Sequence, residues 1–470
     1  MDVLLVEADY KNKYPPLALM KISAYHKSMG DTVFFVKGKN KDLKNRKWDR
    51  IYITTLFTFY WKKTIETIQY YYNSVATPEN IYVGGILATL LKEDLEKTKE
   101  IQGITIQVGL LDKPRILGDE TFPIDFITPD YDIINNSKNK YLNYEYPVND
   151  AYITSTTKGC IRKCKFCAVN TLEPCYYDYI DIKNQINEIN DLYGEKRNLM
   201  LMDNNILASP KLKSIIDDLV ELGFERGNKN YIKTTKNRKI HQTRFVDFNQ
   251  GIDGRLLCEE TIIQLSRIEI RPLRIAFDHA DDESIKIYKN AQRLAAKYGF
   301  KNLSNYVLFN FHDSPEDLYN RLKINIELNK EFKDNKFNTS IWSFPMKYMP
   351  FEGEHRMDRK HIGENWNAKM LRGVQCILNA THAVVGPKEE FFYHAFGCTF
   401  DEFYKIIYMP EKYIIKRKDN AQNIDIWMNL FDELTDCERE AFITLIANNE
   451  FPDIEITNPK IRNLYKCYLK

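Results

Sequence analysis

The chain has 470 residues, 44% hydrophobic and 28% charged, and this length exceeds what a single hydrophobic core usually serves. Its 67 Lys and Arg residues nearly balance its 65 Asp and Glu residues, and the net charge of +2 excludes a global field that steers the chain to nucleic acid or membranes. Because no run of about 18 apolar residues and no signal-peptide pattern occurs, we expect a cytoplasmic protein without membrane association.

The first 117 residues alternate short apolar runs with amphipathic segments. Strands are predicted, in chain order, at 3–8, 32–36, 50–57 and 80–84. Helices are predicted between and after them, at 17–30, 61–75 and 86–95. Strands and helices that alternate at this spacing form a parallel sheet covered on both faces. The sequence therefore predicts a doubly wound, Rossmann-like α/β domain over residues 1–117, followed by a linker over residues 118–149.

The alternation of strands and helices restarts at residue 150. Strands are predicted at 151–156, 198–202, 244–249, 273–277, 305–311 and 339–344. Helices are predicted between and after them, at 182–193, 211–222, 259–268, 282–298, 315–332 and 367–380. These units are fewer than those that close a full TIM barrel, so residues 150–345 are predicted to form a partial, TIM-like (β/α)6 barrel with its active site at the carboxyl ends of the strands. Residues 346–470 are predicted to form a mostly helical C-terminal extension.

Three of the nine cysteines, Cys160, Cys164 and Cys167, lie close together directly after the first predicted barrel strand. An odd number of cysteines in a chain without a signal peptide argues against a disulfide framework. Three thiolates in one short loop can ligate three irons of a [4Fe–4S] cluster and leave the fourth iron open, unlike the four-cysteine runs of ferredoxins. Zinc is the competing metal, but no second Cys or His pair follows at finger-like spacing.

This C-x3-C-x2-C loop, with Phe166 just before its last cysteine, resembles the signature of the radical SAM superfamily, whose members share a partial β/α barrel. The resemblance covers residues 150–345 and implies a [4Fe–4S] cluster whose open iron binds S-adenosylmethionine (SAM). In that family one electron from the cluster cleaves SAM into methionine and a 5′-deoxyadenosyl radical. It also implies an electron donor such as flavodoxin or ferredoxin. The resemblance identifies neither the substrate nor the reaction that follows, and methylation is one alternative for that reaction.

The resemblance assigns roles to residues that follow the later strands. Asp203, after the second strand, is expected to accept a hydrogen bond from the amino group of SAM, with turn chemistry as the alternative. Arg255, after the third, is expected to bind a carboxylate of SAM or of the substrate, with a bridge to Asp253 as the alternative. Asp278, after the fourth, is expected to bind the ribose. Cys175 is expected to be a buried, inert thiol.

The front domain resembles the cobalamin-binding domain that precedes many radical SAM domains. The residues that carry this resemblance are 14–19, 84–86 and 129–132. A cobalamin there is able to carry a methyl group. However, no Asp-x-His-x-x-Gly segment occurs in the first 150 residues, so the lower histidine ligand is not supplied in the familiar way. The resemblance therefore leaves cobalamin binding open, because a fold does not prove a ligand.

Residues 225–244 form a basic stretch between the second predicted barrel helix and the third strand. Its basic residues are Arg226, Lys229, Lys233, Lys236, Arg238, Lys239 and Arg244. We expect it near the open mouth of the barrel, where it can grip a polyanionic substrate, and a solvated loop is the alternative. It supports a second hypothesis for the whole chain, a metal- or cluster-bearing nucleic-acid-binding protein without radical catalysis.

Overall fold

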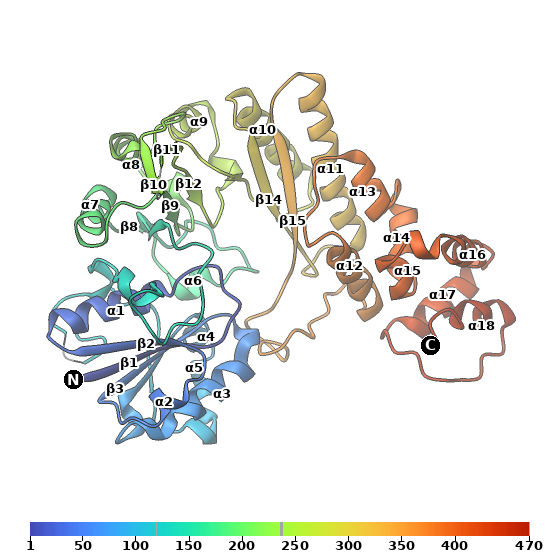
Figure 1. Ribbon diagram of the computed structural model, residues 1–470. Coiled ribbons are helices and arrows are strands. Elements are labelled where there is room, and N and C mark those ends of the chain that lie inside the picture. Colours follow the sequence, from blue (N-terminus) through green and yellow to red (C-terminus); the bar gives the residue numbers. More distant parts are fainter. Residues whose placement is uncertain (119, 236–237, 470) are drawn as a thin grey trace. The chain divides into compact units, whose positions relative to one another are not determined.

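In the computed structural model, which describes residues 1–118, 120–235 and 238–469, five parallel strands form the N-terminal sheet in the order β2-β1-β3-β4-β5 (Figure 1). They are β1 (Asp2–Glu7), β2 (Thr32–Lys37), β3 (Arg50–Thr55), β4 (Ile81–Gly85) and β5 (Thr105–Ile106). The helices are α1 (Leu17–Ser28), α2 (Lys41–Lys44), α3 (Trp61–Tyr71), α4 (Ile86–Leu90) and α5 (Lys92–Lys97). Residues 3–6 of β1 are fully buried, as expected for a central strand covered on both faces. The predicted doubly wound α/β fold is confirmed, and β5 adds a strand to it.

The chain divides into two units, and each is described by itself. Unit 1 comprises residues 1–250, 267–270 and 349–361, and unit 2 comprises residues 251–266, 271–348 and 362–470. The segment 349–361 belongs to unit 1 because it packs on the front domain, where Arg356 forms a two-bond ion pair with Asp94 at 2.6 and 3.0 Å. The domain limits drawn from the sequence stay a prediction.

Unit 1 contains a second sheet of three parallel strands in the order β12-β9-β6. Its strands are β6 (Ala151–Thr154), β9 (Asn198–Leu201) and β12 (Val246–Phe248). The helices α7 (Ile182–Tyr193) and α8 (Leu212–Leu219) connect them in turn. Before β9 and before β12 a helix returns the chain to the amino end of the sheet, so the carboxyl ends of the three parallel strands lie at one edge.

Unit 2 contains a corresponding sheet of three parallel strands in the order β13-β14-β15. Its strands are β13 (Leu273–Arg274), β14 (Asn302–Phe309) and β15 (Ser340–Lys347). The helices that precede these strands in turn are α9 (Glu259–Leu265), α10 (Asp282–Lys297) and α11 (Pro315–Asp334). Parallel strands thus alternate with helices in both units, and the predicted α/β class is confirmed.

The C-terminal part of unit 2 is helical, as predicted. Its helices are α12 (Ala368–Ala380), α13 (Glu389–Phe396), α14 (Phe400–Tyr408), α15 (Glu411–Ile415), α16 (Ala421–Asp432), α17 (Asp436–Ile446) and α18 (Pro459–Tyr465). They share an aromatic core that includes Phe396, Phe403 and Trp427. Lys369 of α12 is fully buried there, and this burial lowers the pKa of its ammonium group to about 8. Across the described residues, no helix has both the length and the hydropathy that crossing a bilayer requires.

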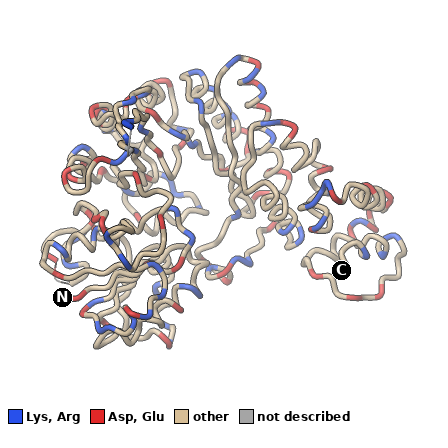
Figure 2. The backbone as a smooth tube through the Cα atoms, in the orientation of Figure 1, with Lys and Arg blue, Asp and Glu red and all other residues tan. Residues whose placement is uncertain are grey.

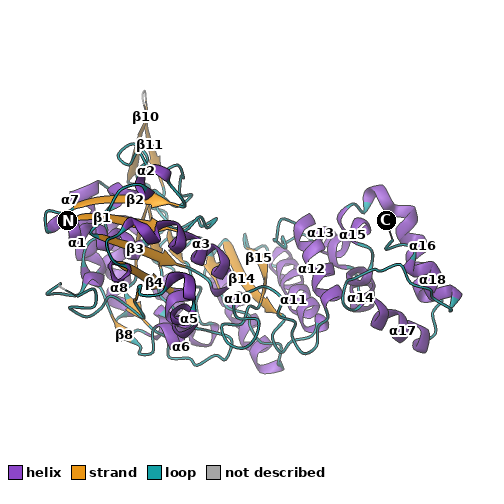
Figure 3. Ribbon diagram, turned by 90° about the horizontal axis from the view of Figure 1, so that it is seen from below, coloured by secondary structure: helices purple, strands orange, loops and turns teal. Residues whose placement is uncertain are grey.

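The basic stretch forms an antiparallel two-stranded ribbon of β10 (Tyr231–Thr235) and β11 (Arg238–Gln242) (Figure 3). This ribbon follows α8 and precedes β12, so it leaves the sheet at the amino end of β12. The expectation that it lies near the open mouth is therefore wrong. The reason is that α8 has already carried the chain back from the carboxyl to the amino ends of the strands. Lys236 lies outside the described residues.

Candidate metal centre

The cysteine loop, residues 159–168, leaves the carboxyl end of β6 through the short strand β7 (Thr157–Lys158). Strand β7 pairs antiparallel with β8 (Tyr177–Asp178), and the helix α6 (Val169–Leu172) lies between the loop and β8. Cys160, Cys164 and Cys167 are partly exposed thiols that take part in no disulfide. The loop thus lies at the strand end that the sequence predicts. Whether its thiols bind a cluster stays a prediction.

Gly159 is a glycine because the backbone of Cys175 passes directly over it. Its φ is +74°, and a Cβ atom at this position would lie 2.1 Å from the carbonyl oxygen of Cys175. The Cys175 side chain is exposed, which corrects the expectation of a buried thiol. The backbone of Cys175 packs against Gly159, and its thiol remains exposed to solvent. The close approach fixes where the cysteine loop begins.

Asp203 holds the strand-to-loop connection from the end of β9. Its Oδ1 accepts hydrogen bonds from the backbone nitrogens of Thr156 and Thr157, at 3.0 and 2.6 Å. The same oxygen accepts from both threonine hydroxyls, at 2.7 and 2.8 Å. The side chain is almost fully buried, and this burial raises its pKa while the donors act in the opposite direction. Asp203 therefore stabilises the loop, and its expected contact with SAM stays a prediction.

Glu173 is a second carboxylate that supports the loop, and the sequence reasoning did not identify it. Its Oε2 accepts from the backbone nitrogen of Gly159 and from the side-chain amide of Asn204, each at 2.7 Å. Its Oε1 lies 3.4 Å from Nζ of Lys158. Glu173 thus joins the residue before Cys160 to the residue after Asp203. Its only signal in the sequence is a carboxylate shortly after the cysteines.

Two nitrogen donors surround Cys160 Sγ. The backbone nitrogen of Arg162 lies 3.3 Å away, and the side-chain amide of Asn205 lies 3.6 Å away. Such hydrogen bonds stabilise a thiolate, and in iron–sulfur clusters they help to set the reduction potential. Over residues 1–118, 120–235 and 238–469, no group of three or more His, Cys, Asp or Glu side chains is arranged to hold one metal ion. In a cubane each cysteine binds a different iron, and three thiols on one loop with these donors fit that ligand set.

Arg255 and Asp278 belong to unit 2, and the structure brings them into one electrostatic cluster. Arg255 forms a two-bond pair with Asp253 at 2.6 and 3.1 Å, so the bridge considered as the alternative is present. Burial raises the pKa of Asp278, while nearby cations that include Arg321 and Arg255 act in the opposite direction. Arg321 is itself buried and pairs with Asp313 at 2.8 Å. The roles of Arg255 and Asp278 toward SAM stay predictions.

The carboxyl ends of β1 and β2 in the front sheet are filled by an ion pair. Lys37 Nζ lies 2.8 Å from Glu7 Oε2, and both side chains are almost fully buried, although the geometry is not that of a well-directed hydrogen bond. Tyr146 of the linker donates a hydrogen bond to the same Glu7 oxygen. The Lys37 ammonium also lies over the ring of Tyr144, 4.6 Å from its centroid. These contacts close this edge of the sheet.

The switch point between β1 and β3, where doubly wound sheets bind ligands, is also occupied by side chains. Tyr10, which follows β1, is 1% exposed and hydrogen-bonds Thr64 at 2.6 Å. Its ring packs on Tyr60 with centroids 4.7 Å apart. His26, the histidine of the first 150 residues, is buried in α1 and bonded to the hydroxyl of Tyr52 at 3.0 Å. These residues do not fit a corrin or supply a ligand for its cobalt.

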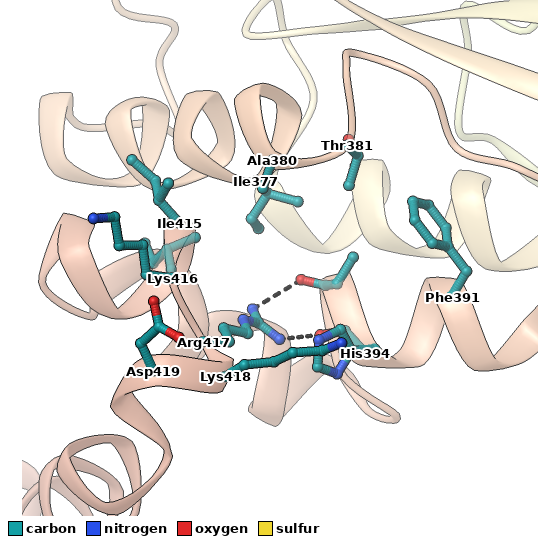
Figure 4. A pocket seen from close by; sticks show the side chains of 12 residues that line it. Ile377, Ala380, Thr381, Phe391, His394, Ile415, Lys416, Arg417, Lys418 and Asp419 are labelled. Carbon is teal, nitrogen blue, oxygen red and sulfur yellow. Dashed lines mark hydrogen bonds between the residues drawn. The ribbon is translucent and has the colours of Figure 1, made fainter.

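A surface hollow of about 390 Å³ lies among the C-terminal helices of unit 2 (Figure 4). Within it, Arg417 donates hydrogen bonds to the backbone carbonyls of His394 and Ala395, at the end of α13. Burial lowers the pKa of this guanidinium to about 10. The hollow contains none of the predicted site residues, and Arg417 within it is engaged with the backbone. The cysteine loop therefore remains the candidate site.

No protein-family model and no curated protein matches the chain. Among solved structures, the crystal structure of SuiB from Streptococcus suis bound to its precursor peptide SuiA matches with 14% identity and a TM-score of 0.30. The match covers 56% of this chain and 55% of SuiB, so the chain spans about half the length of that protein. A likeness of this degree supports no statement about activity or partners.

Proposed function

We propose that the chain is a radical SAM enzyme that holds a [4Fe–4S] cluster on Cys160, Cys164 and Cys167. The observation that carries this proposal is the C-x3-C-x2-C loop with three partly exposed thiols, anchored at the carboxyl end of a parallel strand. Carboxyl ends of such strands are where β/α barrels carry their active sites. When bound and reduced, the cluster supplies the electron for the cleavage of SAM.

Within this proposal, Asp203 positions the loop and binds the amino group of SAM. Its Oδ1 takes four of the hydrogen bonds from the threonine pair, and Oδ2 takes one, from the Thr156 nitrogen at 3.2 Å. Each carboxylate oxygen offers about two lone pairs, and Oδ2 takes one donor from the threonine pair, so Oδ2 retains acceptor capacity for an ammonium group. Glu173 complements it by fixing the Gly159 nitrogen, which orients the residue that leads into Cys160.

Arg255 and Asp278 are proposed to bind the carboxylate and the ribose of SAM. Arg255 already makes a bidentate carboxylate contact, with Asp253, so its side chain has the geometry that carboxylate recognition needs. Asp278 is partly buried, which strengthens a hydrogen bond from a hydroxyl to its carboxylate. Replacement of either residue is expected to raise the concentration of SAM needed for half-maximal cleavage without lowering the iron content.

Anaerobic reconstitution of the full chain tests the proposal. We expect about four irons and four sulfides per chain, and release of 5′-deoxyadenosine when SAM and dithionite are added. Cys164→Ala is expected to abolish both. Cys437→Ala removes an exposed thiol on α17 and is the matched control, expected to behave as wild type. Nucleoside release by Cys164→Ala, or tight zinc with no nucleoside product in the wild type, would overturn the assignment.

Hydrogen abstraction by the nucleoside radical is favoured over methyl transfer from cobalamin. The support is the front sheet, whose carboxyl edge is filled by Glu7, Lys37 and Tyr10. Reconstituted protein incubated with hydroxocobalamin and passed through a desalting column is expected to retain no corrin absorbance. Stoichiometric retention would contradict this choice while leaving the cluster assignment intact.

A further inference from the structure

The ribbon β10–β11 concentrates positive charge in an otherwise balanced chain. Residues 226–246 contain seven Lys and Arg residues and no Asp or Glu. In the described part of this segment the basic residues Arg226, Lys229, Lys233, Arg238 and Lys239 are all exposed. Figure 2 marks the Lys and Arg positions of the chain in blue. A run of this length without an acidic residue is an electrostatic footprint for a polyanion.

The strand register distributes the cations over both faces of the ribbon. Lys233 lies opposite Ile240, and the next pair along the ribbon is Thr234 with Lys239. Residues opposite one another share a face and successive residues alternate, so Lys233 and Lys239 lie on different faces. Ile232 and Ile240 add exposed apolar surface, at 44% and 42% exposure. A ligand that surrounds the ribbon therefore meets positive charge on each side.

The base of the ribbon is firmly attached to unit 1, and the ribbon projects from it (Figure 3). Arg244, at the ribbon's end, is buried and donates to the carbonyls of Leu222 and Lys196 at 2.7 and 3.0 Å. On the other side of the ribbon, the Arg226 nitrogen donates to the carbonyl of Arg267 at 2.8 Å. The two strands form a sheet of their own within the described residues. Such an exposed edge on a fixed base is suited to docking rather than to a fold-stabilising role.

We propose that this ribbon docks in the major groove of double-stranded DNA. Five residues in each strand span about 17 Å, and the B-form major groove, about 12 Å wide, admits a two-stranded ribbon. Lys233 and Lys239, on opposite faces, then meet the phosphates on the two sides of the groove. The isoleucines suit contact with thymine methyl groups. The A-form groove of duplex RNA is too narrow for such entry.

DNA docking is separate from the chemistry proposed for the cysteine loop. The ribbon leaves the amino end of β12, whereas the cysteine loop follows the carboxyl end of β6 in the same parallel sheet. A duplex on the ribbon therefore contacts the opposite end of the sheet from the candidate metal centre. Binding is expected to need neither SAM nor a cluster, and its test is independent of the proposed enzyme activity.

Fluorescence anisotropy with the full chain and a labelled duplex of about 20 base pairs, roughly two helical turns, tests this inference. We expect the logarithm of the affinity to fall linearly with the logarithm of salt concentration between about 50 and 200 mM. The double variant Lys233→Glu/Lys239→Glu is expected to weaken binding at least about tenfold and to reduce the salt slope by about 2. Lys62→Glu/Lys286→Glu makes the same charge change on α3 and α10 and is expected to bind as wild type.

Three results would overturn the inference: equal binding by the ribbon variant and the control variant, tighter binding of a single strand of the same length, or tighter binding of the RNA duplex of the same sequence. Lys233→Gln/Lys239→Gln removes the charges without reversing them and is expected to lose a smaller part of the affinity. Circular dichroism melting of each variant distinguishes weaker docking from a loss of folded protein. All four substituted lysines are exposed, so we expect unchanged melting temperatures.

Discussion

Unit 1 contains two parallel sheets, and charged residues lie at the carboxyl ends of the strands in both. The two places differ in what these charged residues bind. At the front sheet, Glu7 and Lys37 turn toward each other at 2.8 Å and close the carboxyl edge. At the cysteine loop, Asp203 and Glu173 accept hydrogen bonds from backbone nitrogens and leave the three thiols partly exposed. Position at a strand end is thus insufficient to predict a site, because the partners of the charged groups decide whether the edge is closed or reactive.

The largest expected effect concerns the closed edge. Lys37→Met leaves the Glu7 carboxylate buried without its cation, and we expect the free energy of unfolding of unit 1 to fall by about 4 kcal/mol. Equilibrium unfolding in urea measures this free energy. The double variant Glu7→Gln/Lys37→Met removes both charges and is expected to recover most of the loss. If Lys37→Met stays within about 1 kcal/mol of wild type, this edge is hydrated and the contrast between the two edges does not hold.

The next effect concerns the backbone at the entry to the cysteine loop. Gly159→Ala places a Cβ 2.1 Å from the Cys175 carbonyl oxygen at a positive φ, and we expect a loss of about 3 kcal/mol together with a lower iron content after reconstitution. Gly30→Ala is the matched control, because its φ is +80° and no atom lies within 4 Å of the added Cβ. It is expected to lose about 1 kcal/mol. Equal losses in the two variants would show that the contact with Cys175 is unimportant.

Substitution of Asp203 tests whether the cysteine loop depends on the buried carboxylate that accepts its hydrogen bonds. Asp203→Ala leaves the buried nitrogens of Thr156 and Thr157 without their acceptor, and we expect unfolding to become easier by about 2 kcal/mol. Asp203→Asn keeps an acceptor oxygen and is expected to lose roughly half as much. Asp178→Ala removes the carboxylate that pairs with Lys211 near the surface, and its effect is expected to stay below about 1 kcal/mol. If Asp178→Ala and Asp203→Ala lower the free energy of unfolding by similar amounts, Asp203 has no special role in holding the cysteine loop.

Alkaline pH tests the packing at the switch point of the front sheet. Burial raises the pKa of Tyr10 to about 12. Between pH 10 and 12 the folded state therefore keeps this proton while the unfolded state loses it, so stability falls as pH rises through this window. From pH 10 to pH 11 we expect wild type to lose about 1 kcal/mol relative to Tyr10→Phe. Parallel pH profiles of wild type and Tyr10→Phe would instead indicate that solvent reaches this tyrosine.

The helices and strands could be predicted because their signals lie in neighbouring residues. The hydrogen bonds that hold the cysteine loop could not be predicted, because they join residues far apart in the sequence. Helix α7 has the predicted bounds because Asp181 caps its first turn and Gly194 ends it, and both are read from neighbouring residues. The bonds between Asp203 and Thr156 join residues that follow different strands, β9 and β6, and no local pattern in the sequence indicates them. The sequence indicates the basic stretch but not the two strands of the ribbon β10–β11, because they mix polar and apolar residues without clear alternation.

Glu173 gives the smallest expected effect and the finest test of how the cysteine loop is held. Glu173→Gln keeps an oxygen that can accept from the Gly159 nitrogen but loses the charge that faces Lys158 at 3.4 Å. We expect a loss of about 1 kcal/mol, full iron content, and a shifted midpoint potential of the cluster, because hydrogen bonding near the sulfurs sets that potential. Lys158→Met, the control, removes the same ion pair from its other partner and leaves the Gly159 bond in place. Shifts of similar size and opposite sign in the two variants would assign the effect to charge, because one variant removes a negative and the other a positive charge. A shift confined to Glu173→Gln would assign it to the bond that orients the residue before Cys160.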